Sequence, residues 1–229
     1  MTFPDLPARL ASVRGTIAEA QARGGWTHPV TIVAVTKTFG PEAVGAAMEA
    51  GLRAVGENRV QEALVKQEAL AGLDVEWHLI GSLQKNKARQ AAQRFALIHS
   101  VDRLDLAVEL DRRMPPGAAR QAVLVQVNCS AEPQKGGVEP AELAALLDAL
   151  RSLARLEVRG LMTMAELSAD PETARGAFAM LRRLRDEATS RGHRLPELSM
   201  GMSGDFAVAV EEGATMVRLG TILFGGRGT

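Results

Sequence analysis

Short, continuously hydrophobic segments alternate along the chain with longer segments of helical periodicity. Eight of the short segments are rich in β-branched residues, and we expect them to be strands: 31–37, 53–58, 76–83, 95–102, 122–128, 157–164, 197–203 and 216–225. Their hydrophobicity is unbroken rather than alternating, which is typical of parallel strands that are covered on both faces. This pattern favours an α/β fold with a parallel sheet.

Helical segments separate most of these strands. Helical periodicity is found over 41–52, 58–72, 102–114, 140–153, 171–192 and 204–213, and a further helix near 5–23 precedes the first strand. Eight repeats of strand and crossover in 229 residues predict a single (β/α)8 TIM barrel with an extra N-terminal helix. A doubly wound open sheet is the alternative, because periodicity does not reveal whether a sheet closes.

Composition restricts the protein to few classes. No linker-like run divides the chain, and we expect one domain over residues 1–229. Lys+Arg and Asp+Glu both number 27, so the charge indicates neither a nucleic-acid partner nor an anionic membrane. The sequence shows no signal peptide and no segment of membrane-spanning length. Because Cys129 is the single cysteine, an internal disulfide is excluded, and we expect a cytoplasmic protein.

The first strand ends at a lysine. In a TIM barrel the active site is built at the carboxyl ends of the strands, and Lys37 closes the segment VTIVAVTK. Such a lysine can extend into solvent beside the following helix. Alternatively, desolvation and nearby cations lower the pKa of its ammonium group, and the free amine then attacks a carbonyl. The residues around Lys37 leave both interpretations open.

Small residues gather where the seventh and eighth strands lead into their loops, in SMGMSGD (199–205) and RLGT (218–221). Glycine and serine let backbone N–H groups approach an anion, and barrels often hold phosphate in these two loops. Each stretch alone also fits an ordinary turn with a serine at a helix N-terminus. Together with Lys37, the two stretches predict a ligand that carries both a phosphate and an aldehyde.

Seven stretches carry a resemblance to a known family: AVTKT (34–38), GENRVQE (56–62), EWHLIGSLQKNK (76–87), VQVNCSAEPQKGG (125–137), RGLMTM (159–164), LSMGMSGD (198–205) and MVRLGTILFG (216–225). They occur in the same order over nearly the whole chain. With them the sequence resembles the pyridoxal phosphate homeostasis proteins, which are barrels similar to the N-terminal domain of bacterial alanine racemase.

The resemblance implies that pyridoxal 5′-phosphate (PLP) is bound as a Schiff base to Lys37. It also places Arg218 beside the pyridine nitrogen, where an arginine keeps that nitrogen unprotonated and weakens the ring as an electron sink. The remaining implied cofactor-binding residues are Ser203, Gly220 and Thr221 at the phosphate, Ser199 and Gly201 shaping the pocket, and Asn58 and Met162 at the ring or imine.

Neighbouring residues receive plainer interpretations. His78 is predicted to be a hydrogen-bonded core histidine beneath the site. We interpret Lys85, Lys87 and Arg89 as one solvated helix face, with a second anion site as the alternative. The histidines and Cys129 show no spacing typical of metal ligands.

Three functions are compatible with the resemblance. The first is a PLP-binding protein of intracellular vitamin B6 homeostasis with little or no turnover and no catalytic residues. The second is an amino-acid racemase or another slow PLP enzyme. In the resembling racemases a tyrosine from a second, β-rich domain serves one face of the substrate, and this sequence contains no tyrosine. The third is a protein that passes PLP to apo PLP-dependent enzymes. No large apolar stripe stands out, and we expect a monomer.

Overall fold

All eight strands of the computed structural model run parallel, and each pairs with the next along the chain. The model describes residues 2–130, 132, 135–166 and 168–226. The strands are β1 (Thr31–Val35), β2 (Ala54–Glu57), β3 (Glu76–Leu79), β4 (Leu97–Val101), β5 (Gln121–Gln126), β6 (Leu156–Met162), β7 (Glu197–Ser199) and β8 (Met216–Leu219). β8 pairs with β1 from Thr31–Met216 to Ala34–Leu219, which closes the sheet. The predicted TIM barrel is confirmed, and the open sheet is excluded.

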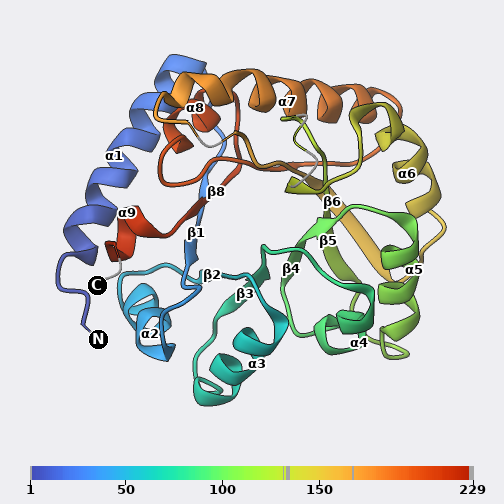
Figure 1. Ribbon diagram of the computed structural model, residues 1–229, viewed down its shortest axis with the longest axis horizontal. Helices are drawn as coiled ribbons and strands as arrows, with labels where there is room; N and C mark the ends of the chain where they lie inside the picture. The colour runs from blue at the N-terminus through green and yellow to red at the C-terminus, as the bar shows by residue number, and fades with distance from the viewer. Residues whose placement is uncertain (1, 131, 133–134, 167, 227–229) are drawn as a thin grey trace.

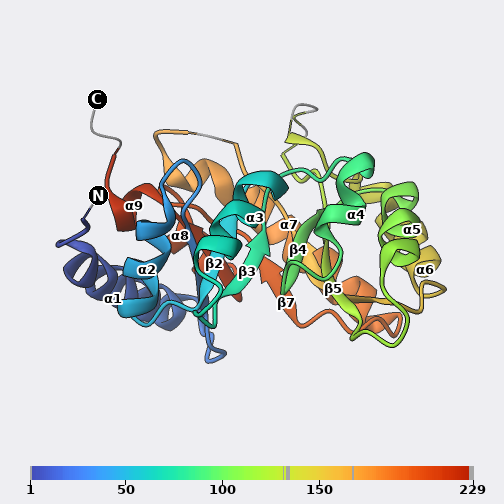
Figure 2. The ribbon, with the colours of Figure 1, turned by 90° about the horizontal axis from the view of Figure 1, so that it is seen from below.

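Helices surround this barrel (Figure 1). The α-helices are α1 (Leu6–Gly24), α2 (Pro41–Glu49), α3 (Val60–Ala69), α4 (Ala88–Ala91), α5 (Leu104–Arg113), α6 (Leu143–Leu150), α7 (Arg175–Ser190), α8 (Phe206–Glu211) and α9 (Thr221–Phe224), and the 3-10 turns are η1 (Lys85–Lys87), η3 (Pro140–Glu142) and η4 (Pro171–Ala174). The predicted N-terminal helix is α1, and it packs against α8 and α9 on the outside of the barrel (Figures 1 and 2). Among the described residues, none of the helices combines the length and hydropathy that crossing a bilayer requires.

Two separate hydrophobic clusters stabilise the barrel. Because successive strand residues point to opposite faces, one set packs against the helices and the other fills the lumen. Trp77 and Leu79 of β3 belong to the outer cluster, as do Val217 and Leu219 of β8. The lumen cluster is small and apolar: Leu97, Ala122, Leu124, Met162 and Met216. The unbroken hydrophobic runs in the sequence follow from burial on both faces.

All eight strands end earlier than predicted, and the differences at β7 and β8 shape the barrel mouth. β8 ends at Leu219 instead of residue 225, because Gly220 precedes α9 and Phe224 packs its ring 5.2 Å from that of Phe3. A short apolar run looks alike in a strand and in a buried helix. β7 ends at Ser199 instead of residue 203, and Gly201 then adopts a φ of 91°, which favours glycine. A loop therefore follows β7 at the mouth, and Gly220 with the start of α9 follows β8.

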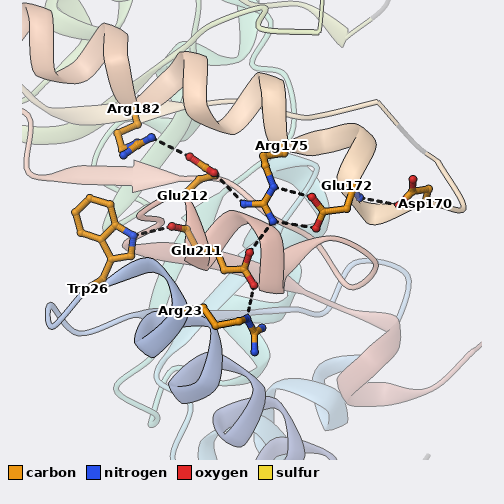
Figure 3. A network of polar contacts seen from close by, with 8 residues as sticks. All are labelled: Arg23, Trp26, Asp170, Glu172, Arg175, Arg182, Glu211 and Glu212. Carbon is orange, nitrogen blue, oxygen red and sulfur yellow. Dashed lines mark hydrogen bonds and ion pairs between the residues drawn. The ribbon is translucent and has the colours of Figure 1, made fainter.

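A network of charged side chains fastens α1 to α7 and α8 on the outside of the barrel (Figure 3). Arg175 of α7 contacts the carboxylates of Glu172, Glu211 and Glu212 at 2.6, 2.6 and 2.9 Å. Arg23 of α1 contacts Glu211 at 2.6 Å, so this carboxylate is shared by α1 and α7. The two arginines, Arg175 first, lower the pKa of Glu211. The network thus holds the C-terminal end of α8, whose N-terminal end follows the loop after β7.

Close packing of β6 against β7 makes Gly160 a sensitive position. A Cβ atom at Gly160 would collide with the backbone carbonyl of Glu197. We expect Gly160→Ala to lower the free energy of unfolding in urea by about 1–3 kcal/mol, because two backbones must move apart. Gly176→Ala is the control, since nothing lies within 4 Å of its added Cβ inside α7. It should stabilise the protein by about 0.5–1 kcal/mol. Wild-type stability of Gly160→Ala would contradict the packing described.

Candidate cofactor site at the barrel mouth

A pocket of about 460 Å³ lies at the carboxyl ends of the strands. This volume is in the range of small-molecule sites. The pocket is lined by Val35, Lys37, Asn58, Ile80, Gly81, Ser82, Gln126, Met164, Met202, Ser203, Gly204, Arg218, Gly220 and Thr221. Six of the nine predicted cofactor-binding residues are in this lining: Lys37, Asn58, Ser203, Arg218, Gly220 and Thr221. They come from segments far apart in the sequence, and the barrel brings them to one mouth.

Lys37 lies on a turn that a buried ion pair anchors through the preceding residue, Thr36. The Thr36 hydroxyl donates to Glu57 Oε1 at 2.5 Å. Lys66 Nζ donates to the same oxygen at 2.6 Å and to the Thr36 carbonyl at 2.8 Å. Glu57 is fully buried, and its Oε2 atom has no hydrogen-bond partner among the described residues. The turn itself contains Thr38 with a φ of 71°, a conformation that non-glycine residues rarely adopt.

Arg218 brings a buried positive charge to the pocket. Its side chain donates from Nη1 to Ser199 Oγ at 2.7 Å and from Nη2 to the Thr163 carbonyl at 2.9 Å. Within the described ranges Arg218 forms no ion pair, although the Asp205 carboxylate acts on its charge at longer range. Burial lowers the pKa of Arg218 to about 10, so it stays charged at neutral pH. A buried cation without a directly paired carboxylate is costly, and an electron-rich atom of a ligand in the pocket would offset that cost.

The loops after β7 and β8 meet at Ser203. The backbone N–H groups of Gly220 and Ile222 donate to Ser203 Oγ at 3.3 and 3.4 Å. Asp205 fixes the first loop, because its carboxylate accepts from the Met202 N–H at 2.5 Å. Small side chains and backbone donors here form an arrangement that suits a phosphate group.

Three predicted site residues lie behind the pocket wall. Met162 is fully buried in the lumen cluster, and Met164, two residues further along the same face, lines the pocket instead. Ser199 is buried and binds Arg218. The carbonyl of Gly201 accepts from the Arg218 backbone N–H at 3.0 Å. These three residues support side chains that line the pocket, and their contact with a cofactor stays a prediction.

Sequence reasoning assigned no site role to Gln126 or His99. Gln126 and Met164 line the pocket, and each lies at the end of a strand whose inward face can be read from alternation. His99 was treated only as part of a strand. Its Nε2 lies 2.9 Å from Nδ1 of His78, and both rings are buried. His78 is thus a hydrogen-bonded core histidine.

Both histidines are neutral at physiological pH. Burial, followed by the charge of Arg159, lowers the pKa of His78 to about 4. Burial, then His78 and Arg218, lower the pKa of His99 well below its usual value. Within the part of the chain that the structure describes, no three His, Cys, Asp or Glu side chains gather as metal ligands would.

Comparisons with known proteins agree on one group. The family model for the alanine racemase N-terminal domain matches residues 10–228. The pyridoxal phosphate homeostasis protein of Aquifex aeolicus is 46% identical over 221 residues, covering 96% of this chain and 97% of the relative. The protein of the same name from Pseudomonas aeruginosa is also 46% identical, over 95% of this chain and 94% of its own.

Solved structures of similar proteins agree with these sequence comparisons. PipY of Synechococcus elongatus without PLP is 42% identical with a TM-score of 0.86, covering 96% of this chain and all of PipY (100%). The structure of PipY with PLP bound is 41% identical with a TM-score of 0.84 over the same shares. An alanine racemase from Clostridium difficile shares the fold alone, at 14% identity and a TM-score of 0.75, covering 94% of this chain and 60% of the racemase.

The ion pair below Lys37 generates a stability prediction. Lys66→Met leaves the Glu57 carboxylate buried without its cation, and we expect the free energy of unfolding to fall by about 3–5 kcal/mol. The double variant Glu57→Leu/Lys66→Met removes both charges and should recover part of that loss in the same urea titration. A double variant less stable than Lys66→Met would contradict the unpaired charge as the cause.

Proposed function

Because the chain belongs to the family of pyridoxal phosphate homeostasis proteins, we propose that it binds PLP for intracellular cofactor homeostasis and holds it as a Schiff base on Lys37. The observation that carries this proposal is the pairing, in one pocket, of Lys37 with a buried Arg218 whose guanidinium is held by a serine and a carbonyl instead of an ion pair in the described structure. The PLP in one PipY structure supports the choice of ligand.

The residues of the pocket fit the chemical groups of PLP. PLP supplies an aldehyde on an electron-withdrawing pyridine ring, and the amine of Lys37 is the group in this pocket that condenses with aldehydes. Ser203, Gly220 and Thr221 offer small side chains and backbone donors for the phosphate. Arg218 would donate to the ring nitrogen and, as a permanent cation, would keep a proton off it. Asn58, directly after β2, lines the same pocket.

We propose that this site stores the cofactor and turns over little or no substrate. Lys37 and Arg218 are the titratable side chains in the described lining of the pocket. Moving a proton on both faces of an amino-acid α-carbon requires a second acid or base, and the sequence contains no tyrosine for that role. An unprotonated ring nitrogen also weakens carbanion stabilisation. Lys37 alone serves one face, which leaves a slow half-reaction as the alternative.

For this function we propose that residues 1–229 form one domain and that the protein acts in the cytoplasm. We propose a monomer that releases PLP to apo PLP-dependent enzymes. The open position of Lys37, exposed at the barrel mouth, supports exchange of the cofactor with a recipient.

Covalent labelling tests the role of Lys37. After incubation with PLP and reduction with borohydride, wild-type protein should carry one added cofactor on the peptide that contains Lys37, measured by mass spectrometry. Lys37→Ala should lose that label. Lys85→Ala is the control, because Lys85 is an exposed lysine paired with Asp105 at 3.2 Å, and it should keep the label. Full labelling of Lys37→Ala would refute the assignment.

Turnover tests the storage role. We expect PLP-loaded protein to show no racemization of L-alanine above the rate of free PLP, because the second proton donor is missing. The measurement is circular dichroism of alanine over hours at neutral pH. A turnover of about one per second or faster, typical of working enzymes, would favour the racemase alternative.

A further inference from the structure

A chain of hydrogen bonds crosses the barrel lumen behind Arg218. It runs from Arg218 on β8 to Ser199 on β7 at 2.7 Å, from Ser199 to His99 on β4 at 2.9 Å, and from His99 to His78 on β3 at 2.9 Å. We propose that Ser199, His99 and His78 are positioning residues that hold the Arg218 guanidinium against the ring nitrogen of PLP and keep that nitrogen unprotonated. This inference rests on the proposed function and adds residues behind the pocket wall to it.

The donors in this chain point in one direction. Arginine only donates, so Ser199 Oγ accepts from Arg218 and its own proton is free for His99 Nδ1. With Nδ1 as acceptor, neutral His99 carries its proton on Nε2 and donates it to Nδ1 of His78. His78 then carries its proton on Nε2. Each link fixes the tautomer of the next, and all links lead back to the arginine.

A second positive charge among the hydrogen-bonded residues Arg218, Ser199, His99 and His78 would be unfavourable. Protonated His99 would place a charge one serine away from the buried Arg218, and protonated His78 would face Arg159 as well. Both rings are buried among lumen residues, where charges are poorly solvated. Burial and these cations lower the pKa of both histidines. Arg218 therefore remains the charged member of this series of hydrogen bonds.

The hydrogen bonds that hold Arg218 use only some of its N–H groups. Nη1 is held by Ser199 and Nη2 by the Thr163 carbonyl, so the guanidinium is fixed at two nitrogens. Its side chain also lines the pocket, and the guanidinium has N–H donors beyond these two that a ligand can use. A lumen filled only by packing would be apolar, as the cluster around Leu124 and Met162 is. Here a polar chain replaces apolar packing in the part of the lumen that reaches the site.

Removing the acceptor for Ser199 should loosen this grip. In His99→Leu, the Ser199 hydroxyl loses its partner and rotates, and Arg218 loses a fixed acceptor. Solvent then reaches the ring nitrogen and protonates it. His99→Gln is the conservative variant, because its amide oxygen accepts from Ser199 while its amide nitrogen donates to His78.

The test is ¹⁵N NMR of the protein loaded with PLP that is ¹⁵N-labelled in the ring, at neutral pH. Wild type and His99→Gln should show the signal of an unprotonated pyridine, and His99→Leu should shift to that of a pyridinium. Leu124→Ala, which opens the apolar lumen cluster, controls for loss of stability alone and should leave the signal unchanged. If His99→Leu does not fold, Ser199→Ala, which removes one oxygen, takes its place with the same expected shift.

The outcomes separate this inference from the proposed function. PLP-loaded His99→Leu or Ser199→Ala with an unprotonated ring nitrogen would overturn the positioning role alone. The positioning role would also be overturned if Leu124→Ala shifted the signal to the same extent, because any change in the lumen would then protonate the ring nitrogen. Wild-type protein that takes up no PLP would overturn the proposed function, and this inference with it.

Discussion

The pairing of β1 with β8 determines where the chemistry of this protein lies. The register Ala34–Leu219 sets the turn after β1 beside the loop after β8, so that Lys37 and Thr221 line one pocket although they are distant in the sequence. Closure of a parallel sheet brings every strand end to the same mouth. An open sheet with the same strands would separate its first and last members. The cofactor site proposed here therefore depends on closure before it depends on any single side chain.

Charges inside the barrel are arranged in two different ways. Glu57 and Lys66 form a buried ion pair through Glu57 Oε1, and they anchor the turn that carries Lys37. Arg218 is buried with hydrogen-bond acceptors yet, in the described structure, without a carboxylate in ion-pairing reach. Replacing a buried pair with apolar groups is often neutral, whereas an unmatched buried charge is costly. The first arrangement serves the scaffold, and the second is explained by a ligand that supplies the missing acceptor.

The sequence predicts well which segments form strands and which faces of them are buried. It predicts less well how deep a side chain lies in the lumen and at which residue an element begins or ends. Unbroken hydrophobic runs identify strands buried on both faces, and Lys37 and Ser203 follow as the last residues of two predicted strands. Periodicity does not say how far into the lumen a side chain lies, so Met162 was expected at the pocket where Met164 lines it. His99 was missed because its partners come from other strands. The start of α9 after Gly220 was missed because packing on α1 decides it.

The central claim is that one amine, one buried arginine and one pair of loops hold the same small molecule. A crystal structure of the PLP-loaded protein tests it most directly. The account predicts continuous density from Lys37 Nζ to the cofactor, the phosphate between Ser203 and the Gly220–Thr221 segment, and the ring nitrogen facing Arg218. PLP bound at this mouth with its phosphate on another loop, or with its ring nitrogen turned away from Arg218, would contradict it.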